Sequence, residues 1–141
     1  MRPASRPLVQ LPATPVSEAD QGIANHVMNL IEDGSTIQLG IGALPNIVGA
    51  MIAQSDLKDL GVHTEMLADS YVDMYEAGRI TGKRKGIDHG KMVYTFAMGS
   101  QKLYDFLDMN PAAAIFPVSY TNNPNVIGSN PKVVAINNAI E

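Results

Sequence analysis

The sequence has 141 residues, of which 45% are hydrophobic and 17% charged, and its formal net charge is -4. This balance is typical of a globular chain and excludes intrinsic disorder, and the absence of cysteine excludes disulfides and Cys-based metal sites. The acidic charge also argues against a nucleic-acid partner, because such proteins carry a clustered basic face. No apolar run approaches the roughly 18 residues of a membrane-spanning helix, so we expect a cytoplasmic protein without a membrane partner.

The first 16 residues contain four prolines at short intervals, which forbid a helix and favour extended chain. We therefore predict an interdomain linker over residues 1–16 and a domain over residues 17–141. At its start, Ser17 and Asp20 form a capping pattern. Apolar residues then follow at helical spacing and predict an amphipathic helix with Gly34 as a plausible residue after its end.

The remaining sequence alternates between apolar runs and helical patterns. We predict strands near 36–40, 62–66, 91–96, 113–118 and 132–137, and helices near 44–54, 70–77, 100–108 and 122–128. The strands are continuous apolar runs, which is typical of strands covered on both faces. The fold class we predict is α/β: a three-layer, open, mainly parallel sheet with helices on both faces. Because an apolar strand close to the last residue has no following helix to cover it, we expect a piece of a larger protein, cut at both ends.

A glycine turn follows the predicted strand 36–40. Gly40-Ile41-Gly42 begins like a dinucleotide-binding fingerprint, but Pro45 occupies the third glycine position and lacks the amide that would hold a pyrophosphate. Two interpretations remain open besides NAD binding. The turn could simply require small residues, or its amides could approach a bulky ligand and polarise a carbonyl group.

The predicted strand 62–66 contains Glu65, and in a parallel sheet its polar end lies at the same edge as the glycine turn. An isolated glutamate after a strand is commonly a helix-terminal carboxylate or a salt-bridge partner, but a carboxylate held dry and aimed can also attack an acyl group. His63 shares a strand face with Glu65 and could orient it, and Asp69 could cap the helix beginning at Ser70. The three histidines have no metal-ligand spacing, so we expect no metal site.

Several segments together resemble the acetyl-CoA hydrolase/transferase family, and within it the 4-hydroxybutyrate and butyrate:acetate coenzyme A-transferases. They are Gln38 to Asn46, His63-Thr64-Glu65-Met66, Gly90-Lys91-Met92, Phe96 to Gly99, Leu103 to Phe106 and Ile136-Asn137. The resemblance covers nearly the whole chain and implies a CoA-transferase-like half-domain, the first part of a C-terminal domain. It implies that Glu65 is the catalytic nucleophile and that coenzyme A is contacted by Gln38, Leu39, Gly40, Ile41, Gly42 and Asn137. Asn46 departs from the aspartate of many relatives, at a position that is not catalytic.

The implied activity is a ping-pong transfer of coenzyme A between an acyl-CoA and a small carboxylic acid, through a glutamyl-CoA thioester at Glu65. Coenzyme A would be a substrate, with no permanently bound cofactor, and relatives suggest a homodimer. An acyl-CoA hydrolase, which lets water reach the same thioester, and a noncatalytic CoA- or nucleotide-binding half-domain are the alternatives. We expect the 141-residue piece alone to be inactive, because a facing domain should close over the thioester.

Overall fold

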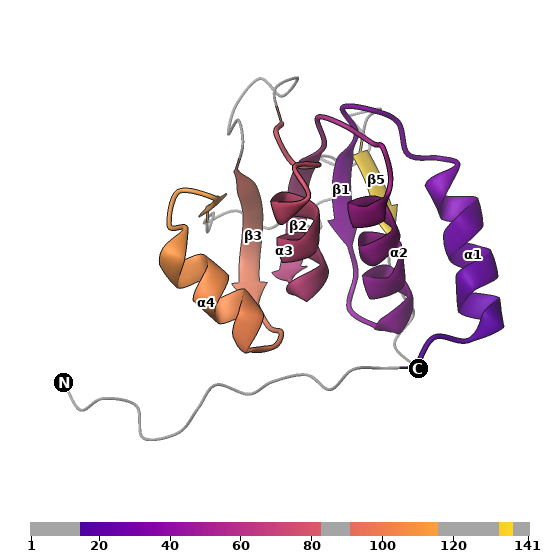
Figure 1. Ribbon diagram of the computed structural model, residues 1–141, viewed down its shortest axis with the longest axis horizontal. Coiled ribbons are helices and arrows are strands. Elements are labelled where there is room, and N and C mark those ends of the chain that lie inside the picture. Colours follow the sequence, from indigo (N-terminus) through magenta and orange to yellow (C-terminus); the bar gives the residue numbers. More distant parts are fainter. Residues whose placement is uncertain (1–14, 83–90, 116–132, 137–141) are drawn as a thin grey trace.

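The computed structural model describes residues 15–82, 91–115 and 133–136. Figure 1 shows a sheet with helices packed against it. The elements in chain order are α1 (Glu18–Met28), β1 (Thr36–Leu39), α2 (Ala43–Gln54), β2 (Gly61–Leu67), α3 (Asp69–Glu76), β3 (Met92–Ala97), α4 (Gln101–Met109), β4 (Ala114–Ile115) and β5 (Val133–Ile136). The helix predicted near 122–128 and nearly all of the predicted linker lie outside the described residues.

The strands form one sheet in the order β4-β3-β2-β1-β5, and every pair of neighbours is parallel. The predicted parallel α/β sheet is therefore confirmed, whereas the helix layer predicted on its second face is not seen among the described residues and stays a prediction. From β1 to β4 each strand is followed by a helix and then by the next strand in the same direction across the sheet. Because such crossovers are right-handed, α2, α3 and α4 lie on one face of the sheet, and α1 packs beside α2 (Figure 1).

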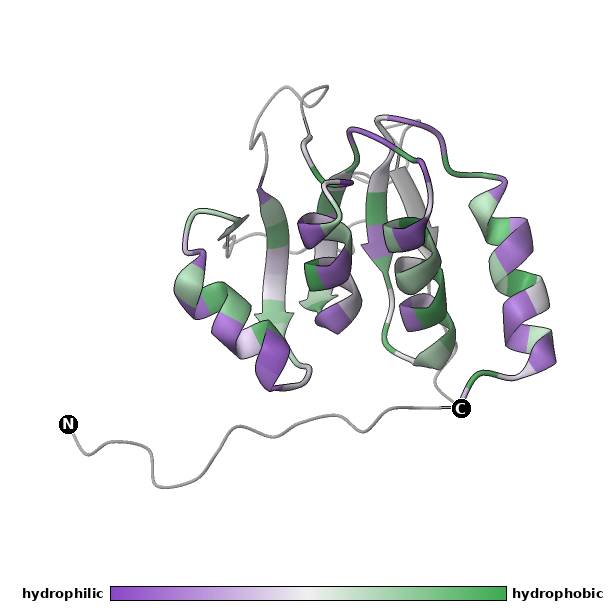
Figure 2. Cartoon of the chain, in the orientation of Figure 1, coloured by the Kyte–Doolittle hydropathy of each residue, from purple (hydrophilic) through white to green (hydrophobic). Residues whose placement is uncertain are grey.

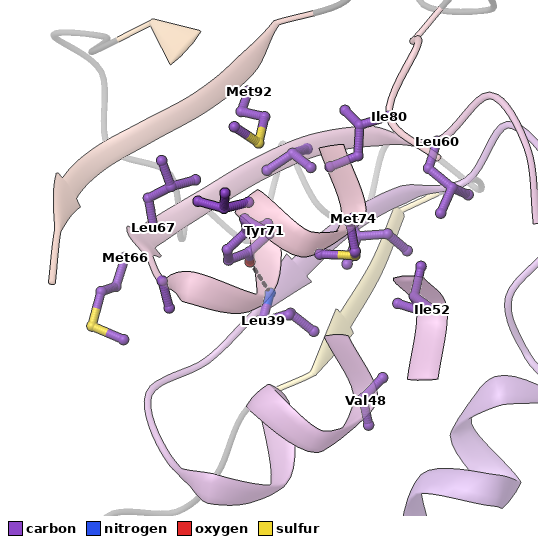
Figure 3. Close-up of a cluster of buried hydrophobic side chains, with 14 of the residues drawn as sticks. Leu39, Val48, Ile52, Leu60, Met66, Leu67, Tyr71, Met74, Ile80 and Met92 are labelled. Carbon is purple, nitrogen blue, oxygen red and sulfur yellow. Dashed lines mark hydrogen bonds between the residues drawn. The ribbon is translucent and has the colours of Figure 1, made fainter. Parts of the chain in front are cut away.

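The core lies between this row of helices and the sheet. In Figure 2 the strands are largely hydrophobic, whereas each helix alternates between hydrophobic and hydrophilic residues, as expected when one helix face is buried. Figure 3 shows the centre of this core. Its largest fully buried apolar side chains are Ile37, Ile52, Leu60, Leu67, Met74, Met92 and Leu103.

A glycine allows α2 and α3 to approach closely. A Cβ atom on Gly49 of α2 would lie 2.7 Å from both Cβ and Oγ of Ser70 and 2.9 Å from Cδ1 of Leu39. Real Cβ atoms essentially never come so close, so the start of α3 occupies the space that any larger residue at position 49 would need. This contact fixes α3 relative to α2, beside the end of β1.

The helix ends confirm one sequence prediction and correct two. Ser17 and Asp20 form the predicted capping box at the start of α1. Gly34 does not end that helix, because α1 stops at Met28 with Asn29 as its cap, and Gly34 instead turns the chain into β1 with a φ of 82°. Asp69 is the first residue of α3 rather than its cap, which is Ala68, and its carboxylate bonds a distant residue instead. No helix among the described residues is long and apolar enough to span a membrane.

Candidate active site at the carboxyl ends of β1 and β2

The chain after β1 forms the predicted glycine turn. Gln38 and Leu39 end the strand almost fully buried, with exposures of 1% and 2%, whereas Ile41 in the turn is 40% exposed. Gly42 is the N-cap of α2 and has a φ of 140° and a ψ of 176°. Only glycine adopts this conformation readily, so the turn depends on Gly42 for its shape. The N-cap makes no side-chain hydrogen bond to the first turn of α2.

Glu65 lies in the second half of β2 and is half-buried. Val62, Thr64 and Met66 are buried, whereas His63 and Glu65 between them are only partly covered. Side chains alternate across a strand, and the Thr64 side chain bonds Tyr71 of α3. Glu65 and His63 therefore belong to the sheet face opposite α3.

A buried hydrogen-bonded group joins the ends of β1 and β2. The Tyr71 hydroxyl accepts a hydrogen bond from the backbone N–H of Leu39 at 2.7 Å, the contact drawn in Figure 3. The same hydroxyl donates to Thr64 Oγ1 at 2.8 Å, and Thr64 Oγ1 donates to the carbonyl oxygen of Leu39 at 3.1 Å. We call Leu39, Thr64 and Tyr71 the strand-end network.

This network places the two predicted parts of the site at one edge of the sheet. Leu39 directly precedes Gly40, and Thr64 directly precedes Glu65. The glycine turn and the Glu65 carboxylate therefore come directly after two residues, Leu39 and Thr64, that are joined by a hydrogen bond. Sequence reasoning missed Tyr71 entirely and treated Thr64 only as a neighbour of Glu65; the signal was a threonine in the middle of a buried strand with a tyrosine seven residues later.

Asn137 lies outside the described residues. It follows Ile136, the last residue of β5, which pairs in register with Leu39. The ends of the three neighbouring strands β5, β1 and β2 thus lie at one edge of the sheet. Asn137 follows β5, Gly40 follows β1, and Glu65 lies within β2.

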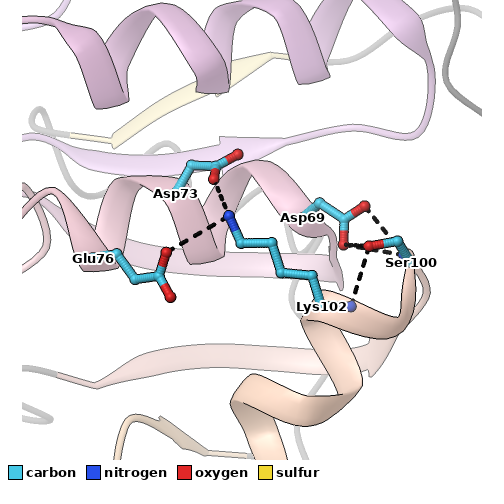
Figure 4. Close-up of polar contacts among 5 residues, drawn as sticks. All are labelled: Asp69, Asp73, Glu76, Ser100 and Lys102. Atoms are coloured by element: carbon cyan, nitrogen blue, oxygen red, sulfur yellow. Dashed lines mark hydrogen bonds and ion pairs between the residues drawn. The ribbon is translucent and has the colours of Figure 1, made fainter.

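A groove of 690 Å³ opens at the same edge of the sheet, but on the helix face. It runs between α2, the start of α3 and the start of α4, and Ala43, Asn46, Asp69 and Ser100 are among its lining residues. Asp69 and Ser100, which both line the groove, are hydrogen-bonded to each other (Figure 4). Glu65 does not line this groove, so the groove and the carboxylate face different sides of the sheet.

Known proteins are similar to most of this chain. The model of the acetyl-CoA hydrolase/transferase C-terminal domain matches residues 99–141. The chain is 51% identical over 137 residues to a probable butyrate:acetyl-CoA coenzyme A-transferase of Syntrophomonas wolfei, covering 97% of this chain and 31% of the relative.

Two solved structures are also similar. RipA from Yersinia pestis superposes with a TM-score of 0.82 at 39% identity, over 92% of this chain and 30% of the other. The 4-hydroxybutyrate CoA-transferase from Porphyromonas gingivalis superposes with a TM-score of 0.78 at 40% identity, over 92% of this chain and 33% of the other. The chain thus spans about a third of the length of the proteins it matches. With this agreement in sequence and in fold, the chain belongs to the acetyl-CoA hydrolase/transferase family.

Proposed function

We propose that this chain is the part of an acyl-CoA:carboxylate CoA-transferase that carries the nucleophile, Glu65. The single observation that supports this most is the hydrogen bond of 3.1 Å between Thr64 and the carbonyl oxygen of Leu39. It ties the residue before the carboxylate to the residue before the glycine turn. In this proposal, residues 1–16 form an interdomain linker and residues 17–141 the first part of the C-terminal domain.

The reaction we propose proceeds in two covalent steps. The Glu65 carboxylate attacks the thioester carbonyl, the C–S bond breaks, and a mixed anhydride and the CoA thiolate result. The thiolate then attacks the Glu65 carbonyl of the anhydride, which releases the free carboxylate and leaves a glutamyl-CoA thioester. An incoming carboxylate reverses both steps and leaves as the new acyl-CoA.

The glycine turn supplies hydrogen-bond donors in this proposal. Negative charge develops on the carbonyl oxygen at each attack, and backbone N–H groups aimed at that oxygen stabilise it by about 3 kcal/mol per donor. Gly40 and Gly42 have no Cβ atom, so coenzyme A can approach the backbone closely. Gln38, Leu39, Ile41 and Asn137 complete the proposed CoA contacts.

Hydrolysis of acyl-CoA is the second candidate, and one observation favours it. Glu65 is only half-buried in this chain, so water reaches it unless another part of the protein covers it. Consumption of acyl-CoA without an added carboxylic acid would identify a hydrolase. Strict dependence on the added acid would identify a transferase, the activity in the names of the two CoA-transferases described above.

The test is intact-mass analysis of the full-length protein after incubation with acyl-CoA, with borohydride used to trap the thioester. We expect an adduct at Glu65 in the natural protein and none in Glu65→Gln, together with a loss of turnover of more than about 10⁴-fold. Glu76→Gln is the matched control, because it makes the same chemical change at an exposed carboxylate of α3. Full turnover by Glu65→Gln would disprove the nucleophile assignment, and CoA binding without an adduct would indicate a binding module.

We also propose, from the family resemblance, a cytoplasmic homodimer that uses coenzyme A only as a substrate. Light scattering of the full-length protein measures the oligomeric state. The 141-residue chain alone should show no turnover, and measurable transferase activity of this chain by itself would contradict that expectation.

A further inference from the structure

The sheet opens between β1 and β2 at their carboxyl ends. The pairing of these strands includes Thr36↔Gly61 and ends at Ile37↔Val62, although β1 continues to Leu39. In contrast, β1 stays paired with β5 as far as Leu39↔Ile136, and β2 stays paired with β3 as far as Leu67↔Ala97. The opening therefore lies between β1 and β2 and not in the two pairs that flank them, and it is next to the glycine turn and Glu65.

The strand-end network replaces the backbone ladder in this opening. The N–H of Leu39 donates to the Tyr71 hydroxyl, and its carbonyl oxygen accepts from Thr64 Oγ1, so both polar backbone groups of Leu39 bond side chains instead of the backbone of β2. Thr64 Oγ1 also lies 3.3 Å from the carbonyl oxygen of Met66, a second acceptor for its proton. Each of the two hydroxyl groups has one proton to donate, and each proton has an acceptor within the strand-end network.

The network is fully enclosed. Tyr71 and Thr64 both have an exposure of 0%, so loss of either hydroxyl leaves buried partners without a hydrogen bond. Burial also raises the pKa of Tyr71, which keeps its hydroxyl protonated and able to donate to Thr64. Gly49 leaves room for the side chain of Ser70, the residue before Tyr71, because a Cβ atom at position 49 would lie 2.7 Å from it, and this close approach of α2 and α3 helps to place the tyrosine.

We propose that Tyr71 and Thr64 are positioning residues that hold the end of β1 at a fixed spacing from Glu65. This inference rests on the proposed function, in which Glu65 attacks a thioester that is polarised by the turn after Leu39. The two hydroxyls touch neither substrate nor carboxylate in this scheme. They act through the backbone of Leu39 and Thr64, whose neighbours carry the reacting groups.

Misplacement of reacting groups by about 1 Å costs on the order of 10²-fold in rate. We therefore expect Tyr71→Phe, which keeps the ring and removes only the hydroxyl, to slow formation of the glutamyl-CoA adduct by about 10- to 100-fold. The KM for acyl-CoA should change less than this rate, because neither hydroxyl contacts coenzyme A in this scheme. Thr64→Val should have a similar effect, and Thr64→Ser should recover the rate that Thr64→Val loses, since serine restores Oγ.

The experiment is single-turnover adduct formation by the full-length protein, with Ile52→Val as the control. Ile52 is fully buried in the same core and takes no part in the network, so its variant reports what a small loss of stability alone does to the rate. If Tyr71→Phe fails to fold, the pair Thr64→Val and Thr64→Ser decides the question. Unchanged adduct rates in Tyr71→Phe and Thr64→Val, or equal losses in Ile52→Val, would overturn the inference. So would a raised KM with an unchanged rate.

The proposed function fails in a distinguishable way. If the natural protein forms no adduct at Glu65, the function is wrong. If the natural protein forms the adduct and the hydroxyl variants form it equally fast, only the positioning role is wrong.

Discussion

The carboxylate of Asp69 binds Ser100 across 31 residues of sequence. The backbone N–H of Ser100 lies 3.0 Å and 3.1 Å from the two carboxylate oxygens, and Ser100 Oγ donates to Oδ1 at 3.0 Å (Figure 4). Ser100 is the N-cap of α4, and its Oγ in turn accepts from the N–H of Lys102 at 3.2 Å. One carboxylate at the start of α3 thus fixes the start of α4.

We predict that Asp69→Ala destabilises the protein by about 1.5–3 kcal/mol, the range for hydrogen bonds to charged groups. Asp73→Ala is the matched control, because it removes an exposed carboxylate from the same helix that pairs with Lys102. An exposed ion pair contributes less than about 1 kcal/mol, so the control should lose less. Urea denaturation measures both variants, and equal losses would contradict the role of Asp69.

A second prediction concerns Gly49. Gly49→Ala should destabilise the protein by about 1–3 kcal/mol, because its new Cβ atom would overlap Ser70 and Leu39. Gly22→Ala, in α1, meets nothing within 4 Å and should stabilise the protein by about 0.5–1 kcal/mol through higher helix propensity. Thermal unfolding should therefore show shifts of opposite sign for the same chemical change.

Gly42 allows a third prediction, which separates stability from activity. Gly42→Ala forces alanine to a φ of 140°, which costs about 1–3 kcal/mol and distorts the turn beside the proposed site. Gly78→Ala is strained as well, at a φ of 72°, but lies beyond the other end of α3. Both variants should lower the unfolding temperature, and only Gly42→Ala should also slow adduct formation in the folded protein. A comparable slowing in Gly78→Ala would show that strain alone is responsible.

Lys102 provides a prediction about pH. Its pKa is raised from the ordinary value of 10.5, chiefly by the hydrogen bond to Asp73, and Glu76 lies 3.6 Å from the same ammonium group. A raised pKa means that folding favours the charged form, so the stabilisation is complete below 10.5 and is lost as the pH rises through the folded pKa above that value. Because the group is exposed, the effect should stay below about 1 kcal/mol.

The measurement compares urea unfolding of the natural protein and Lys102→Met at neutral pH and near pH ~11. The difference between the two proteins should shrink at the alkaline pH. Lys58→Met, which removes an exposed lysine elsewhere, is the control and should show no such shrinkage. A difference that is independent of pH would contradict the ion-pair origin.

Much of the fold could be predicted from sequence because the relevant signals are local. The apolar runs near 36–40, 62–66 and 91–96 match β1, β2 and β3 to within one residue at every end, and strand–helix alternation correctly implied a parallel sheet. Asp69 was misassigned because its partner, Ser100, is distant in sequence. A short-range capping pattern cannot reveal a bond between the ends of two helices.

For the site, the topology alone predicted that the glycine turn and Glu65 share one edge, since parallel strands end on the same side. The sequence could not reveal that the strands separate there. In the sequence, Thr64 and Tyr71 look like ordinary members of a buried strand and an amphipathic helix. Only their hydrogen bonds to the backbone of Leu39 show that their side chains lie between the separated ends of β1 and β2. Such a gap depends on the approach of α3, which no local pattern encodes.

The one-sided placement of α2, α3 and α4 has a practical consequence. A sequence without cysteine accepts a single introduced thiol, and Met109, 79% exposed at the end of α4, is a convenient position for it. A fluorophore attached to Met109→Cys would sit on the helix side and leave the Glu65 side open to a bulky thioester. The fluorescence of the label could then report unfolding while consumption of the thioester reports turnover in the same sample, without the label blocking access to Glu65.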